Sequence, residues 1–253
     1  MQKTNLNSMM KTAKVAAVLF LSMLPLGAIS MGLVACNNDD SEVSSEVIDK
    51  SPAQAIDLGL PSRTLWASCN VGATKPEEYG DYFAWGETMG YNGGKNNFSW
   101  STYRWCNGSE DKLTKYCNDR DSGNNGFTDN KIELDLEDDA AFVNWGSNWR
   151  MPSREQLQEL IDNCDWEWMT LNGVYGQKAT SKKNGNSIFL PAAGRRYGTE
   201  DTMGTVTRGY YWSRSLYTYK PDGTYYMEFR SGSVDCWGYY RCGGQSVRPV
   251  RRN

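Results

Sequence analysis

Two cysteines near the C-terminus, Cys236 and Cys242, are the most closely spaced thiols in this sequence and lie in the segment DCWGYYRC. The 253-residue chain contains no histidine, which excludes Cys–His and Ser–His nucleophile pairs and removes the commonest zinc ligand. The six cysteines other than Cys36 allow fifteen complete disulfide patterns in an exported domain, and Cys236 with Cys242 is the expected close pair. The other cysteines are Cys69, Cys106, Cys117 and Cys164.

An acidic run between residues 133 and 139 offers the oxygen ligands that calcium takes. Its carboxylates alternate with leucine and isoleucine, which is the pattern of a half-exposed strand that leads into a helix. A second segment, DRDSGNNG at 119–126, begins like an EF-hand loop, but Gly123 stands where the third ligand belongs. We therefore expect no bound metal, and no nucleotide cofactor because no glycine-rich phosphate loop opens a helix. The acidic run consists of Glu133, Asp135, Glu137, Asp138 and Asp139.

The segment between residues 209 and 250 is rich in tyrosine, serine, glycine and arginine. Tyr225, Met227 and Phe229 alternate and are predicted to face the core, so the side chains between them are predicted to face outward. Tyrosine brings a rigid ring with a polar tip and arginine brings directed donors, so the outward side chains have the composition of a binding surface. The predicted ligand-binding residues are Arg214, Tyr217, Tyr219, Tyr226, Glu228, Arg230, Ser233, Asp235, Trp237, Tyr239, Tyr240 and Arg241.

The expected ligand of this surface is a glycan or a protein of a cell surface, a phage or a host. The net charge of -3 gives no reason to expect electrostatic binding to nucleic acid. The alternative is an ordinary solvated sheet, because tyrosine is also a frequent strand residue.

Short strands and two helices are predicted to position this surface. The better-marked helix begins after Ser153, which forms a capping box with Gln156, and the other is predicted at 138–144. Residues 87–130 are predicted to be mostly loop, held to the body by aromatic side chains. Few helices followed by several antiparallel strands predict an α+β fold for the domain at 54–253. The predicted strands are 55–60, 64–67, 188–191, 209–214, 225–230 and 246–250.

Residues 1–35 have the layout of a signal peptide, with lysines followed by an apolar stretch that ends in LVAC. Small residues directly before Cys36 resemble the lipobox of bacterial lipoproteins, in which the cysteine is acylated. The alternative is an ordinary cleavage site with Cys36 as a bystander. Residues 36–53 are polar and acidic, which is typical of a flexible tether. The pair Asp39 and Asp40 resembles a surface-export signal, so we expect an outer-membrane lipoprotein, held by its lipid anchor alone and exposed on the cell surface.

Several segments together resemble one family. AIDLGLPSRTLWASCNVGATKPEEYGDYFAWGET, LEDDAAFVNWGSNWRMPSREQLQELIDNC, NGNSIFLPAAGRR, GYYWSRS and SVRPV are similar to the Fibrobacter succinogenes major paralogous domain, over residues 55–250. This family resembles a branch of the C-type-lectin-like fold that is related to formylglycine-generating enzymes. The resemblance implies short antiparallel strands, two helices and long loops, with paired N- and C-terminal strands and a ligand face near the C-terminus.

The resemblance leaves three functions open. Members of the family are mostly exported lipoproteins, and some are carried at the tips of surface fibres, so a structural fibre subunit is one alternative. Formylglycine-generating enzymes use two nearby cysteines, so Cys236 and Cys242 suggest an oxidase as another, although a structural disulfide is the commoner role. The calcium-dependent sugar site of true C-type lectins does not carry over, because its Glu-Pro-Asn-like and Trp-Asn-Asp-like triplets do not occur. We expect a binding protein rather than an enzyme.

The end of the domain also resembles the variable proteins of diversity-generating retroelements, in which adenines of Asn codons are replaced. Such codons can become Tyr, Ser, Asp, Gly, Arg, Cys or Thr, but never Trp or Glu. Most of the predicted ligand-binding residues belong to the first group, whereas Glu228 and Trp237 would be fixed by the template. The same process would explain Cys236 and Cys242 without any chemistry.

Overall fold

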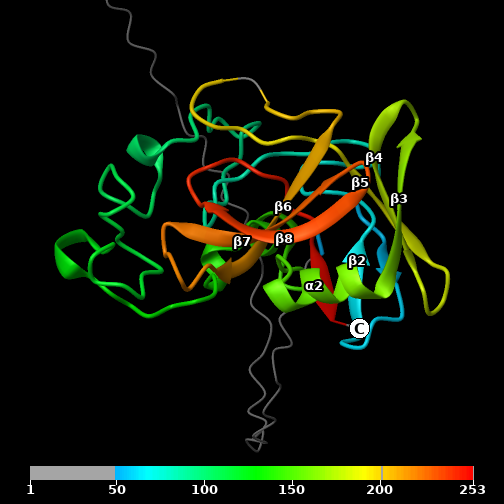
Figure 1. Cartoon of the computed structure of the whole chain (residues 1–253), viewed down its shortest axis with the longest axis horizontal. Helices are drawn as coiled ribbons and strands as arrows, with labels where there is room; N and C mark the ends of the chain where they lie inside the picture. The colour runs from blue at the N-terminus through cyan, green and yellow to red at the C-terminus, as the bar shows by residue number, and fades with distance from the viewer. Residues whose placement is uncertain (1–48, 201, 253) are drawn as a thin grey trace, which may run out of the picture. The chain divides into compact units, whose positions relative to one another are not determined.

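A three-stranded antiparallel sheet lies at the centre of the domain (Figure 1). Its strands are β6 (Arg208–Leu216), β7 (Gly223–Arg230) and β8 (Ser233–Tyr240), joined in sequence order. The computed structural model describes residues 49–200 and 202–252. The predicted signal peptide, Cys36 and most of the predicted tether therefore lie outside the described residues.

Both faces of this sheet are buried against hydrophobic clusters. On one face Tyr211, Met227 and Phe229 pack in a cluster with Leu157 and Leu160 of helix α2 (Arg154–Asn163). The strands alternate, so the opposite face carries a different set of side chains. These side chains pack in a second cluster, which is rich in tryptophan. They are Tyr210, Trp212 and Tyr226. Of the three residues predicted to face the core, Met227 and Phe229 are fully buried, whereas Tyr225 is half-buried.

The two ends of the described chain pair in a second sheet. Strand β2 (Thr64–Ala67) lies between β1 (Ala55–Asp57) and β9 (Val250–Arg252), and both pairings are antiparallel. Trp66 is opposite Val250, so the pairing of N- and C-terminal strands that the resemblance implies is present. The strand predicted at 246–250 is displaced: β9 begins at Val250, and Ser246 makes only an isolated bridge with Tyr211.

A third sheet contains a hairpin that the sequence analysis did not predict. Its strands are β3 (Cys164–Leu171), β4 (Val174–Ser181) and β5 (Ser187–Pro191). The two residues of the β3–β4 turn are Asn172 and Gly173, both with positive φ, at 49° and 85°. An Asn-Gly pair between two apolar runs is a strong signal for such a turn, so the hairpin was visible in the sequence.

Both predicted helices are present. Helix α2 (Arg154–Asn163) begins after Ser153, and the predicted capping box with Gln156 is formed in both directions. Helix α1 (Ala140–Trp145) is capped by Asp139, whose carboxylate accepts from the backbone N–H groups of residues 141 and 142. With three antiparallel sheets and these two helices, the structure is compatible with the predicted α+β class.

The acidic run does not form the half-exposed strand that its alternation predicted. Glu133 makes an isolated bridge with Ser215, and the following residues turn into the 3-10 helix η3 (Leu136–Asp138). Asp139 caps α1, so the chain turns at residues 136–138 to begin the helix and does not continue as a strand. Local capping therefore decides the conformation of this segment.

Residues 87–130 are mostly irregular, with two short 3-10 helices, η1 (Trp100–Thr102) and η2 (Asn124–Gly126). Phe98 and Tyr103 are buried in a third cluster with Tyr82. The prediction that aromatic side chains hold this loop segment to the body is confirmed. The described residues, 49–200 and 202–252, belong to a single compact unit. No helix within residues 49–200 and 202–252 combines the length and apolar character needed to cross a membrane.

Arg248 joins two of the sheets from the interior. Its guanidinium donates to the carbonyl oxygens of Ala67 at the end of β2 and Phe189 in β5, at 3.1 and 2.9 Å, and to Oδ1 of Asn70 at 2.8 Å. The side chain is 1% exposed and has no carboxylate within 4.0 Å among the described residues. Burial lowers the pKa of Arg248 below its ordinary value. These three acceptors are therefore what keeps the charge in the core.

Replacing Arg248 with Met should lower the free energy of unfolding by about 3 kcal/mol, because hydrogen bonds to a charged group contribute about 1.5–3 kcal/mol each. Denaturant unfolding measures the change. The matched control is Arg230→Met at the exposed end of β7, for which we expect a change within about 0.5 kcal/mol. Equal effects of the two substitutions would show that Arg248 does not hold the sheets together.

Candidate ligand-binding surface

The register of β7 and β8 brings seven of the twelve predicted ligand-binding residues onto one face of the central sheet. Glu228 is opposite Asp235, and Tyr226 is opposite Trp237. Because side chains alternate along a strand, the residues two positions away from these four lie on the same face. The members that reach the surface are named the β7–β8 face: Glu228, Arg230, Ser233, Asp235, Trp237 and Tyr239.

Exposure differs among the residues of this face. Trp237 is 57% exposed, and Asp235 is also exposed. Tyr226 is only 5% exposed, so its prediction as an outward ligand-binding residue is wrong. Its ring packs against those of Trp212 and Tyr239, because β7 is the middle strand and is covered on both sides. β8 has no strand on its outer side, so its side chains are left open.

Two arginines that the sequence analysis did not select border this face. The guanidinium of Arg195 lies over the ring of Tyr239 at 4.1 Å from its centroid, and 4.8 Å from that of Tyr210. Nη1 of Arg208 is 2.5 Å from Oε1 of Glu228. These contacts join residues that are distant in the sequence, so they could not be predicted before the strand register was known. These contacts hold the donors and acceptors of the surface in place.

The β7–β8 face combines an exposed indole ring with donors and acceptors of both charges. The ring of Trp237 can stack on a sugar or fill a depression in a protein partner. The carboxylates of Asp235 and Glu228 can accept hydrogen bonds, and Arg230 can donate them. This arrangement is suited to recognition.

Three other predicted residues lie apart from this face, near the β6–β7 turn. Tyr217 covers Gly238, where an added Cβ would lie 2.9 Å from the tyrosine ring, and its ring meets that of Tyr225 at 5.1 Å. Tyr219, 84% exposed, lies 5.6 Å from Tyr217 between ring centroids. Because Gly238 and Tyr225 belong to the opposite face of the sheet, Tyr217 does not join the β7–β8 face. Tyr240 contacts Trp100 of the long loop at 6.1 Å between centroids.

Arg241 is a structural residue, and its prediction as an outward ligand-binding residue is wrong. The side chain is fully buried and donates from Nη2 and Nη1 to the carbonyl oxygens of Lys115 and Tyr116, both at 2.8 Å. Its guanidinium also lies near the ring of Trp85. The chain turns inward directly after β8, and Arg241 ties that turn to the long loop.

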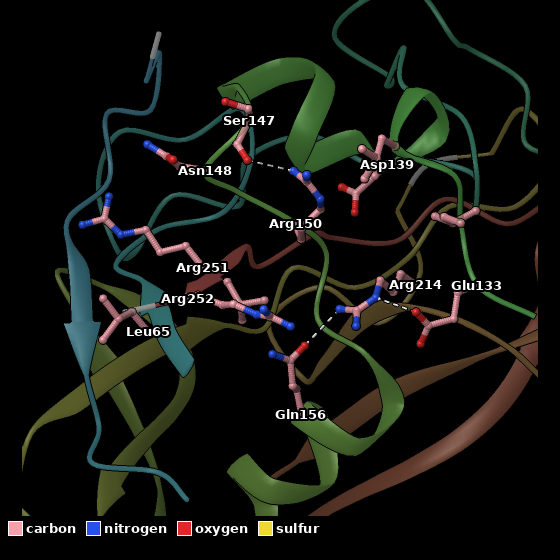
Figure 2. A pocket seen from close by; sticks show the side chains of 13 residues that line it. Leu65, Glu133, Asp139, Ser147, Asn148, Arg150, Gln156, Arg214, Arg251 and Arg252 are labelled. Atoms are coloured by element: carbon pink, nitrogen blue, oxygen red, sulfur yellow. Dashed lines mark hydrogen bonds and ion pairs between the residues drawn. The ribbon is translucent and has the colours of Figure 1, made fainter. Parts of the chain in front are cut away.

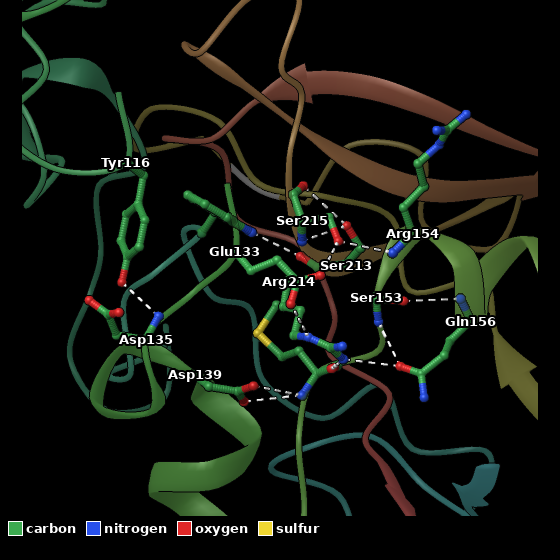
Figure 3. Close-up of polar contacts among 12 residues, drawn as sticks. Tyr116, Glu133, Asp135, Asp139, Ser153, Arg154, Gln156, Ser213, Arg214 and Ser215 are labelled. Atoms are coloured by element: carbon green, nitrogen blue, oxygen red, sulfur yellow. Dashed lines mark hydrogen bonds and ion pairs between the residues drawn. The ribbon is translucent and has the colours of Figure 1, made fainter. Parts of the chain in front are cut away.

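Arg214 lies at another place, beside the start of α2 (Figure 3). Its Nε is 3.0 Å from Oε2 of Glu133, and its Nη1 donates to Met151 O and Gln156 Oε1, both at 3.0 Å. The irregular pairing between Trp212 and Leu216 directs this side chain out of the sheet. Arg214 therefore joins the acidic run, β6 and α2, and lines a cavity between them.

The acidic run holds a lysine ammonium group. Oxygen atoms of Asp135, Glu137 and Asp138 lie close enough together to ligate a metal ion. Nζ of Lys115 is 2.7 Å from Asp135, 3.6 Å from Glu137 and 2.6 Å from Asp138. Tyr116 also donates its hydroxyl to Asp138 at 2.5 Å. This lysine already supplies a positive charge to the carboxylates.

Cys236 and Cys242 are not joined, so the predicted disulfide is not formed. Cys236 packs against the cluster that contains Met227 and Leu157. Cys242 is buried in the cluster that contains Tyr82 and Phe98. The end of β8 and the inward turn at Arg241 separate their surroundings. Burial raises the pKa of the Cys236 thiol to about 11 and that of Cys242 to about 12. Both are therefore thiols near neutral pH, because the effect of burial exceeds that of the positive charges of Arg154 near Cys236 and Lys95 near Cys242.

No protein family, curated protein or solved structure matches this chain. The resemblance to the Fibrobacter succinogenes major paralogous domain therefore stays a prediction.

The raised pKa values predict slow alkylation of Cys236 and Cys242 in the folded protein. The thiolate is the reactive form, and at pH 8 a thiol of pKa 11 is ionised in about one molecule per thousand. Iodoacetamide labelling followed by peptide mass spectrometry should find both thiols largely unmodified at pH 8, and modified faster as the pH rises towards 11. After unfolding, both should react at the rate of a free cysteine. A peptide pair linked through Cys236 and Cys242 would contradict the structure.

Proposed function

We propose that this chain is a surface-anchored, non-enzymatic binding protein whose β7–β8 face contacts a glycan or a protein. The observation that carries the proposal is the exposed Trp237 on an otherwise well-packed sheet, with charged side chains around it. A large exposed ring surrounded by polar residues is typical of the centre of a binding site.

The rigidity of the supporting sheet favours tight binding. Tyr226 of β7 and Trp237 of β8 are cross-strand neighbours, and the other face of β7 is buried with Met227 and Phe229. Arg195 is held by the ring of Tyr239, so its guanidinium is ordered before a ligand arrives. Side chains that are ordered before the ligand binds lose less entropy on binding.

The shape of the surface favours a macromolecular ligand. Five hollows on the described part of the chain are lined by other segments, and none of them includes a residue of β7 or β8. A small molecule usually needs a concave site, whereas a glycan chain or a protein can bind a flat one. Recognition would use stacking on Trp237 and hydrogen bonds to Asp235, Glu228 and Arg230.

The C-type-lectin-like fold is part of the same proposal. Its support is the α+β arrangement, the pairing of β2 with β9 and the long irregular segment at 87–130. Acylation at Cys36 and exposure on the outer membrane are further parts, supported by the sequence pattern at 33–36 and by the acidic tether. An oxidase that uses Cys236 and Cys242 is not favoured, because the two thiols enter different clusters.

Trp237→Ala should weaken binding at least tenfold, because truncating a central aromatic residue of an interface typically costs about 2 kcal/mol or more. The assay first screens the purified protein on a glycan array and against surface proteins of intact cells, and then compares variants on each ligand found. Tyr175→Ala is the matched control, since Tyr175 is exposed on the β3–β4 hairpin. Equal binding by the two variants would remove the β7–β8 face from the proposal. The absence of any ligand in both screens, with the fold intact, would remove the binding function.

If a retroelement diversifies the C-terminal stretch, variation should follow exposure as well as codon type. Positions 230, 233 and 235 are accessible and should vary, whereas Tyr226 and Arg241 are buried and should stay constant in functional copies. Sequencing the gene from many cells of the source population measures this. Variation at adenines of a nearby near-copy, beside a reverse transcriptase gene, would support diversification. An unchanging stretch without such a copy would indicate a binding protein of fixed specificity.

A further inference from the structure

A cavity of about 690 Å³ lies between the α1–α2 connection, the start of α2 and strand β9 (Figure 2). Four arginines line it, from the α1–α2 connection, from β6 and from β9. Its other charged lining residues are Glu133 and Asp139. The arginines are Arg150, Arg214, Arg251 and Arg252. Positive charge therefore exceeds negative charge in the lining by two.

The two carboxylates of the cavity already have partners. Glu133 is paired with Arg214 and accepts from the hydroxyl of Ser215. Asp139 accepts hydrogen bonds from the backbone N–H groups of α1 and of Met151, at 2.9–3.1 Å. Burial raises the pKa of Asp139, although these donors oppose the change. Both carboxylates are therefore already engaged, and the arginines outnumber them.

Two of the arginines lack an anionic partner. Arg251 is 3.5 Å from Asp49, but Arg150 and Arg252 have no carboxylate within 4.0 Å anywhere in residues 49–200 and 202–252. Arg150 donates only from Nη1, to the carbonyl oxygens of Ser147 and Trp149. Its guanidinium lies 4.2 Å from the centroid of the Phe142 ring, which fixes its plane.

The arginines also repel one another. Burial lowers the pKa of Arg150, and the charge of Arg214 lowers it further, while Asp139 opposes both effects. Figure 2 shows the side chains of Arg214 and Arg252 entering the cavity from different elements. Like charges gathered in a concave site attract an anion and are stabilised by it.

The lining also indicates what kind of anion would fit. The apolar contribution comes from Leu65, Leu134, Leu136 and Val250, and none of the thirteen lining residues drawn in Figure 2 is aromatic. A neutral sugar would find no ring on which to stack. The volume is within the range of about 300–1,000 Å³ that is usual for small-molecule sites, and it is much larger than a single inorganic ion needs.

We propose that this arginine-lined cavity binds a small acidic molecule, whose carboxylate or sulfate group pairs with the guanidinium groups of Arg150 and Arg252. Arginine forms two parallel hydrogen bonds to either kind of oxyanion. This site is separate from the β7–β8 face and does not depend on the function proposed for that face.

Isothermal titration calorimetry at low ionic strength tests the proposal with three probes: succinate, inorganic sulfate and the neutral analogue succinamide. Succinate should bind the purified protein and succinamide should not. Binding of sulfate as well would identify the oxyanion as the feature recognised, and its failure to bind would identify the carboxylate. Added salt should weaken the binding, because the pairing is electrostatic.

Arg252→Gln should weaken succinate binding at least tenfold, and Arg150→Gln should have a similar effect. Arg252 is exposed and makes no ion pair with the described residues, so its substitution is expected to leave the fold intact even if Arg150→Gln disturbs the packing on Phe142. Arg230→Gln, on the β7–β8 face, is the matched control and should bind like the unmodified protein, as should Trp237→Ala. The proposal is overturned if neither succinate nor sulfate binds, if succinamide binds equally well, or if Arg252→Gln binds succinate unchanged.

Discussion

The burial of the central sheet on both faces determines much of the rest of the domain. A slip of β7 by one residue against β6 would exchange Met227 with Tyr226 between the two clusters. The pairing is therefore strongly specified. β7 lies in the middle of the sheet, so its Tyr226 is buried, whereas Asp235 and Trp237 on the edge strand β8 are exposed.

Arginine has three different roles within a short part of this chain. Arg241 and Arg248 are fully buried and donate to backbone carbonyl groups, which joins loops and sheets that are distant in sequence. Arg214 is half-buried and links the acidic run to α2. Arg230 is exposed at the end of β7. The residue type is the same, and the number of carbonyl oxygens around each guanidinium decides whether it supports the fold or can meet a ligand.

The two proposed sites differ in shape and in chemistry. The β7–β8 face has an exposed indole ring and carries charges of both signs, so it suits a large partner. The cavity beside α2 is concave, without aromatic lining, and has more arginines than carboxylates, so it suits a small anion. Arg214 lines the cavity and belongs to β6, so the central sheet supports both sites.

Features that depend on neighbours along the chain could be predicted from the amino-acid sequence alone. The capping box at Ser153, the cap-led helix after Asp139, the α+β class and the inward direction of Met227 and Phe229 all follow from local hydrogen bonds and periodicity. The turn at Asn172 and Gly173 also follows from the local sequence. The alternation of side chains could assign seven of the predicted ligand-binding residues to one face of the sheet. It could not predict which of the seven are exposed.

Which of those residues are accessible depends on how distant segments pack in the folded domain. Alternation shows which side chains share a face, but it does not show which distant segment covers that face. The tryptophan-rich cluster covers Tyr226, the loop at 115–116 surrounds Arg241, and separate clusters receive Cys236 and Cys242. The arginine-lined cavity was hidden for the same reason, because its lining is assembled from segments that only folding brings together.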